Sequence, residues 1–200
     1  MIWWRKARAV PLIAAAILAT IACGLFLGNI ELPLPVLAGQ SGTFLLAHLM
    51  TLMPAVTLLY GFDRANNQTE STAVRSMASW NAALGVCTAA MAILITTASH
   101  IALQSDLSIV LGRNSAGYIG IALLLYPILG PQLAGAVLAI TPLALAATGW
   151  APSGAPETWA WILHPADSVI SITSAIGVIG VGAATTALWS RPPLQTTWRS

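Results

Sequence analysis

Long apolar stretches separated by short polar ones dominate this sequence. A membrane-spanning helix needs about 20 mostly apolar residues to cross a hydrocarbon core of ~30 Å. Five stretches meet or nearly meet that length: residues 10–28, 42–62, 77–98, 132–149 and 168–189. A sixth, residues 107–130, is interrupted by Gly112, Arg113 and Asn114. We predict from it either a span with a polar outer end or a broken span.

A tight turn is expected directly after the sixth stretch, at Gly130 and Pro131. Gly-Pro pairs mark turns, because glycine accepts unusual backbone angles and proline cannot continue a helix. The two neighbouring spans should therefore form an antiparallel hairpin. The whole pattern predicts an all-α fold, with residues 1–200 forming a single polytopic transmembrane bundle of six spans.

The basic residues give this bundle an orientation. Cytoplasmic loops of membrane proteins carry an excess of Lys and Arg. With six spans and an inner N-terminus, seven of the eight basic residues fall on the inner side: Arg5, Lys6, Arg8, Arg64, Arg75, Arg191 and Arg199. Only Arg113 falls on the outer side. The asymmetry predicts that both termini are cytoplasmic (N-in, C-in).

Composition agrees with a lipid-exposed chain and excludes some functions. Only 7% of the residues are charged and 57% are hydrophobic, whereas a soluble domain carries about 25% charged residues. Mean hydropathy is +0.80. The net charge of +2 is too small for binding nucleic acid, which requires a basic patch that neutralises phosphates. We expect a multi-pass protein of a plasma (inner) membrane, of bacterial type, with membrane lipid around it.

Enzyme motifs are absent from the sequence. It contains no H-E-x-x-H, no G-x-S-x-G and no nucleotide-binding P-loop, which are the local patterns of metalloproteases, serine hydrolases and ATPases. Its six carboxylates include no closely spaced pair for acid–base chemistry. We therefore predict no catalytic residue, no cofactor and no enzymatic activity.

Sulfur and imidazole side chains raise the question of a metal. They are His48, Met50, Met53, Cys87 and Met91. Cys87 and Met91 are four residues apart on one helix face, and soft sulfur ligands suit a cuprous ion. Thioethers are also common gap-fillers, and the spacing is loose. We favour core packing and predict no metal site, and a metal-handling channel stays a third functional hypothesis.

Two polar loops stand out. In the inner loop, residues 63–75, Thr69 or Ser71 can cap a short helix with Glu70 in its first turn. This loop is either a docking helix for a cytoplasmic partner or an ordinary solvated connector. At the outer face, we expect Arg113 to meet His100 and Asp106 in water.

The outer loop, residues 150–167, has a second short element. Pro156 suits the first turn of a helix and Pro165 ends one. Between them, Trp159 and Trp161 give an aromatic segment that either lies in the membrane interface, dips back into the protein, or anchors a surface loop.

Taken together, this layout resembles the permease subunits of type-2 ABC exporters, in particular small alanine-rich ones from actinobacteria. The resemblance covers nearly the whole chain as layout and short stretches. It implies a coupling helix in the inner loop that contacts an ATPase through Glu70, Thr72 and Arg75. It also implies a re-entrant outer element with Glu157, Trp159, Trp161 and His164. Arg113 and Asn114, at the entry of the fourth span, form a candidate polar gate.

The resemblance also implies partners and a mechanism. A cytoplasmic ATP-binding cassette subunit would supply the energy through the inner loop. A second permease copy or a paralogue would complete the path for an amphipathic peptide, a lipid-like or a drug-like cargo. The alternative is a non-transporting membrane subunit that anchors or assembles a larger complex, because glycine-rich helices with few interior polar groups suit that role equally.

Overall fold

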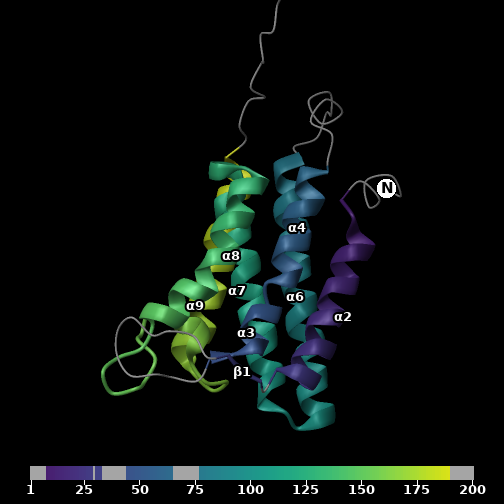
Figure 1. Ribbon diagram of the computed structural model, residues 1–200. Coiled ribbons are helices and arrows are strands. Elements are labelled where there is room, and N and C mark those ends of the chain that lie inside the picture. Colours follow the sequence, from purple (N-terminus) through teal and green to yellow (C-terminus); the bar gives the residue numbers. More distant parts are fainter. Residues whose placement is uncertain (1–7, 29, 33–43, 65–76, 190–200) are drawn as a thin grey trace, which may run out of the picture.

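The computed structural model describes residues 8–28, 30–32, 44–64 and 77–189 (Figure 1). Within these residues, six helical segments are long and apolar enough to cross a membrane. They are α2 (Val10–Leu27), the consecutive α3 (Leu46–Met50) and α4 (Met53–Asp63), α6 (Met77–Leu103), α7 (Asp106–Leu129), α8 (Pro131–Thr148) and α9 (Val169–Leu188). The prediction of an all-α bundle with six spans is confirmed.

Short strands and a 3₁₀ turn complete the described elements. Strands β1 (Glu31–Leu32) and β2 (Phe44–Leu45) pair antiparallel beside the start of α3. The 3₁₀ turn η1 (Trp161–Leu163) lies in the loop between α8 and α9. Both features lie at the same end of the bundle (Figure 1).

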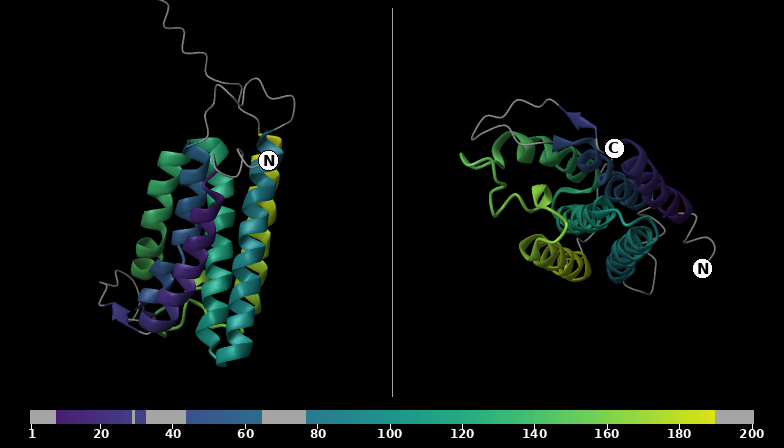
Figure 2. Two further views of the ribbon diagram at one scale, coloured as in Figure 1. Left: turned by 90° about the vertical axis from the view of Figure 1, so that its right-hand side faces the viewer. Right: turned by 90° about the horizontal axis from the view of Figure 1, so that it is seen from below.

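The helices run side by side, and successive spans alternate in direction (Figures 1 and 2). Helices α2 and α6 begin at the end of the bundle where α4 and α9 finish. We call it the inner end, because the Lys and Arg distribution predicts that it faces the cytoplasm, and we call the opposite one the outer end. That assignment of sides stays a prediction from the basic residues.

Helix α7 lies at the centre of the bundle (Figure 2). Of its 18-residue apolar stretch, 72% is buried inside the protein, against 28% for α8 and 22% for α9. It packs most extensively against α6 and α9, and also against α2, α4 and α8. The outer helices expose large apolar side chains such as Leu94, Ile140 and Ile176, which lipid must cover.

The interrupted sixth stretch is a continuous helix. Helix α7 runs through Gly112, Arg113 and Asn114 without a break, so the alternative of a broken span is wrong. Small residues are tolerated there because they let neighbours approach closely: a Cβ on Gly112 would collide with the Thr96 side chain of α6. The turn at Gly130, with a φ of 81°, forms the expected hairpin between α7 and α8.

Two prolines inside spans are matched by threonines of neighbouring helices. A proline lacks the N–H that would bond the carbonyl four residues earlier, and lipid offers no substitute donor. For Pro54 that carbonyl belongs to Met50, and the Thr20 hydroxyl of α2 donates to it over 3.2 Å. For Pro127 it belongs to Leu123, and the Thr186 hydroxyl of α9 donates to it. Each of these two hydrogen bonds thus connects the proline-containing helix to a neighbouring helix.

Candidate functional site

The loop between α8 and α9 turns back into the bundle at the outer end. It leaves α8 through a tight turn at Gly154, where φ is 79°, and Trp150 forms an isolated β-bridge with Pro156. The chain then reaches Ala160, which precedes η1, and Ile162 within η1, and both are 0% exposed. The sequence left three alternatives for this segment, and the structure has the one in which the segment dips back into the protein. The turn is a single 3₁₀ turn rather than an α-helix.

Arg113 of α7 holds the backbone of this loop. Its two terminal nitrogens donate to the carbonyl oxygens of Pro165 at 2.7 Å and His164 at 2.8 Å. Its Nε donates to the Asn114 side-chain oxygen at 3.1 Å. Arg113 is itself only 6% exposed, whereas its two bonds to the loop carbonyls are part-buried. A guanidinium buried in this way needs acceptors, and the two carbonyls supply them.

Asn114 makes the second connection. It is fully buried, and its amide nitrogen donates to the Ile162 carbonyl oxygen at 3.0 Å. Its oxygen accepts from Arg113. The two neighbouring side chains therefore act as one unit that bonds three carbonyls within residues 162–165 of the loop. The structure brings this sequence-predicted pair together with the predicted outer element, and its role as a gate stays a proposal.

Trp161 lies directly against α7. A Cβ on Gly117 would overlap the six-membered ring of its indole, so only glycine fits beneath the ring. From the other side, the Ser171 hydroxyl of α9 donates to the Trp161 carbonyl oxygen at 2.8 Å. Neither Gly117 nor Ser171 was expected from the sequence. A glycine one turn after Arg113 was the only available signal.

His164 closes the loop on itself. Its Nε2 lies 3.1 Å from the Glu157 carbonyl oxygen, and its Nδ1 lies 3.4 Å from the Ser168 hydroxyl. Because a carbonyl only accepts, a neutral ring carries its proton on Nε2 and accepts from Ser168 on Nδ1. Glu157 contributes its backbone here. Trp159 is 54% exposed and lines an apolar hollow together with Val137, Ile140 and Leu145 of α8.

The expected meeting of Arg113 with His100 and Asp106 in water is wrong. His100 Nδ1 does lie 3.9 Å from Asp106 Oδ1 at the outer turn, where Asp106 is 85% exposed. Arg113 is instead buried one to two turns further along α7. At that position its acceptors are the carbonyls of His164 and Pro165 and the side chain of Asn114, whereas the exposed Asp106 carboxylate stays hydrated at the end of the helix.

Core packing is also wrong for three of the sulfur residues, of which Met53 is 37% exposed on α4. Cys87 is exposed and Met91 is 49% exposed, so both lie on the outward face of α6. His48 is buried instead, stacked on Phe44 with ring centroids 5.1 Å apart, and its Nδ1 lies 3.1 Å from the Leu45 carbonyl oxygen. The sequence-predicted ATPase contacts Glu70, Thr72 and Arg75 lie outside the described residues.

The six apolar helices define a multi-pass membrane protein. Comparison with known protein families, with curated proteins and with solved structures found no match to this chain. Its function is therefore argued from its own residues.

Proposed function

We propose that this chain is the membrane-spanning permease subunit of an exporter that is driven by a separate ATP-binding cassette subunit. A second permease copy or a paralogue would complete the path. One observation carries the proposal: the outer loop returns into the bundle as non-helical backbone and is fastened to the central helix by Arg113 and Asn114. Irregular backbone at membrane depth is tolerated only where protein buries it or where it lines a cavity.

Transport gives such a segment a purpose. Broken or re-entrant segments form the gates and binding sites of many transporters, since their backbone groups can change partners. The Arg113 bonds lie entirely on one side chain, so a small shift of α7 relative to the loop breaks all of them together. An element with two discrete arrangements is what coupling between distant sites requires.

Helix α7 is a direct connection from the inner end to this gate. At 24 residues it is about 36 Å long at 1.5 Å per residue. It packs against α4 and α6, which flank the inner loop of residues 65–76. We propose that closure of the ATPase on this loop displaces α4 and α6, that α7 moves with them, and that the outer segment is released from Arg113.

The interior of the bundle indicates the kind of cargo. Apart from the gate, side chains that face α7 are mainly small or apolar, as at Gly24 with Leu111 and Gly85 with Leu123. Such an interior does not hold a strongly hydrated solute. The cargo we propose is amphipathic, such as a peptide, a lipid-like or a drug-like compound.

A second function is favoured by the same close packing. A Cβ on Gly182 of α9 would collide with the Gly120 carbonyl oxygen of α7, so these two backbones are in contact. A bundle closed this tightly suits a non-transporting subunit that anchors or assembles a larger complex. In that function the outer segment would be a fixed contact surface.

Co-purification and ATP hydrolysis distinguish the two functions. The chain is isolated in mild detergent, its partners are identified by mass spectrometry, and substrate-stimulated ATP hydrolysis is measured after reconstitution. The permease proposal requires an ATP-binding cassette subunit and predicts that replacing Glu70 and Arg75 together by alanine uncouples hydrolysis. The matched control is Asp106→Ala at the outer turn, which should hydrolyse normally. Normal coupling in the double variant, or the absence of an ATPase, leaves the assembly function.

A further inference from the structure

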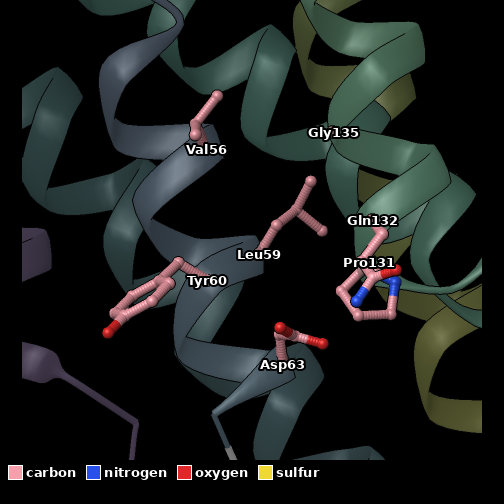
Figure 3. A pocket seen from close by; sticks show the side chains of 7 residues that line it. All are labelled: Val56, Leu59, Tyr60, Asp63, Pro131, Gln132 and Gly135. Carbon is pink, nitrogen blue, oxygen red and sulfur yellow. The ribbon is translucent and has the colours of Figure 1, made fainter.

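An open groove lies at the inner end of the bundle, between α4 and α8 (Figure 3). Val56, Leu59, Tyr60 and Asp63 line it on α4, and Pro131, Gln132 and Gly135 line it on α8. Its volume is about 210 Å³, larger than the ~150 Å³ apolar cavity that accepts a benzene molecule.

The groove is apolar along its length and polar at one end. Val56, Leu59 and Gly135 form its apolar part, whereas Asp63 and Gln132 lie near each other at its inner end (Figure 3). From Val56 to Asp63 the helix rises about 10 Å at 1.5 Å per residue. Because Asp63 is the last residue of its span, the polar end lies at the membrane surface and the apolar part extends into one leaflet.

The polar end carries a negative charge. The Asp63 carboxylate makes no ion pair within the described part of the chain, and the adjacent Arg64 is exposed at the helix C-cap. The C-terminus of α4 adds the negative end of its helix dipole, which disfavours a carboxylate there. The N-terminus of α8 lies across the groove, and its first residue, Pro131, has no N–H to donate to the carboxylate. A cation at this position would pair with Asp63 and with the negative end of α4.

We propose that this groove binds a single-chain amphiphile with a protonated amine head. The ammonium group would pair with Asp63 and donate to the Gln132 side-chain oxygen. The alkyl chain would lie along Val56, Leu59 and Gly135. A phosphate-bearing lipid is disfavoured because Asp63 would repel its phosphate, and two acyl chains exceed the volume. Binding here does not depend on whether the chain transports.

A photoactivatable derivative of dodecylamine tests the proposal on the purified full-length protein in neutral detergent. Matched derivatives of dodecanol and dodecanoic acid serve as probes without the positive charge. Cross-linked residues are mapped by mass spectrometry. The amine should label residues 56–63 and 131–135 about threefold to fivefold more than the alcohol, as one half-exposed charge pair allows, and the acid least of all. Equal labelling by the three probes would show a groove that merely takes lipid and would overturn the proposal.

Two variants separate the head from the tail. Asp63→Asn should reduce labelling by the amine to the level of the alcohol. Gly135→Leu should reduce labelling by the amine and by the alcohol, because the leucine side chain would occupy the groove. The fold has room for a Cβ at this position, since its nearest neighbour, Leu59 Cδ1, lies 4.0 Å away. The control Asp106→Asn, an exposed carboxylate at the outer end, should label like the wild type. Undiminished labelling of Asp63→Asn would contradict the proposal. On the wild type, unlabelled dodecylamine should compete with the amine probe and reduce its labelling, which tests the site without any variant.

Discussion

The outer and inner ends of this bundle are held together in different ways. At the outer end, Ala160, Ile162 and Leu163 of the loop between α8 and α9 are buried, and three carbonyls of the loop receive donors from Arg113 and Asn114. At the inner end, α4 and α8 leave an open groove whose carboxylate, Asp63, is exposed. Buried polar groups are costly to leave unpaired, whereas exposed charges contribute little. Substitutions that remove buried polar contacts, as at Arg113, should therefore have large effects, and substitutions of exposed charges, as at Asp63 and Asp106, should have small ones.

The largest effect is expected at Arg113. Replacing it by alanine removes the donors of two part-buried carbonyls and the partner of the buried Asn114, so the free energy of unfolding should fall by about 3 kcal/mol, at the lower end of 1–3 kcal/mol for each of the three groups. Titration with sodium dodecyl sulfate in mixed micelles measures it. Arg113→Lys keeps the charge but loses the forked geometry and should recover only part of the loss. Full recovery would show that charge alone matters.

Gly117 comes next, because nothing larger fits under Trp161. Gly117→Val should destabilise the protein by about 1–3 kcal/mol, the usual cost of overpacking. Trp161→Ala alone leaves a cavity, but combined with Gly117→Val it should recover much of the loss. The same unfolding titration on the four variants gives the coupling. Additive effects of the two substitutions would mean that the ring does not lie on this glycine.

The proline–threonine pair within the bundle should give a smaller effect. Thr186→Val leaves the Leu123 carbonyl without a donor and should cost about 0.6–1.7 kcal/mol, the range found for hydrogen bonds between membrane helices. Pro127→Ala restores an N–H for that carbonyl, so Thr186→Val should then cost less. If the threonine substitution costs the same in both backgrounds, the hydrogen bond does not replace the missing helical one.

The smallest effect is expected at the exposed pair of His100 and Asp106. Their side chains are 3.9 Å apart and Asp106 is 85% exposed, so Asp106→Ala should change the free energy of unfolding by about 0.5 kcal/mol or less. The loss should not exceed that of Thr186→Val in the same titration. A larger loss would remove the contrast between buried and exposed polar contacts.

The spans followed from the sequence because lipid imposes long apolar helices whatever their neighbours. The hairpin followed from Gly130 and Pro131 for an equally local reason. The partners of Arg113 did not follow, since the carbonyls it bonds lie about fifty residues further along the chain. The local sequence pattern around Arg113 shows only that it lies near the end of its span and does not show which groups it bonds. The outward position of Cys87 was also missed, because an evenly apolar helix gives no sign of which face meets lipid.

The proline–threonine contacts were half predictable. A proline inside a span identifies the carbonyl that lacks a donor, four residues earlier. Which hydroxyl supplies the donor depends on how the helices pack, and several threonines were available. The groove beside Asp63 could not be predicted from the sequence for the same reason, because it exists only where α8 lies beside α4.

The claim at the centre of this account is that the outer segment is fastened at rest and is released during transport. Ile162, which is 0% exposed, reports on it directly. Cys23 and Cys87 are replaced by alanine, Ile162→Cys is introduced, and the chain is reconstituted with its co-purifying ATPase. Labelling by a membrane-impermeant maleimide at the outer face should be slow without ATP and should accelerate during ATP hydrolysis. Equal labelling rates in the two conditions would contradict a gate at this position.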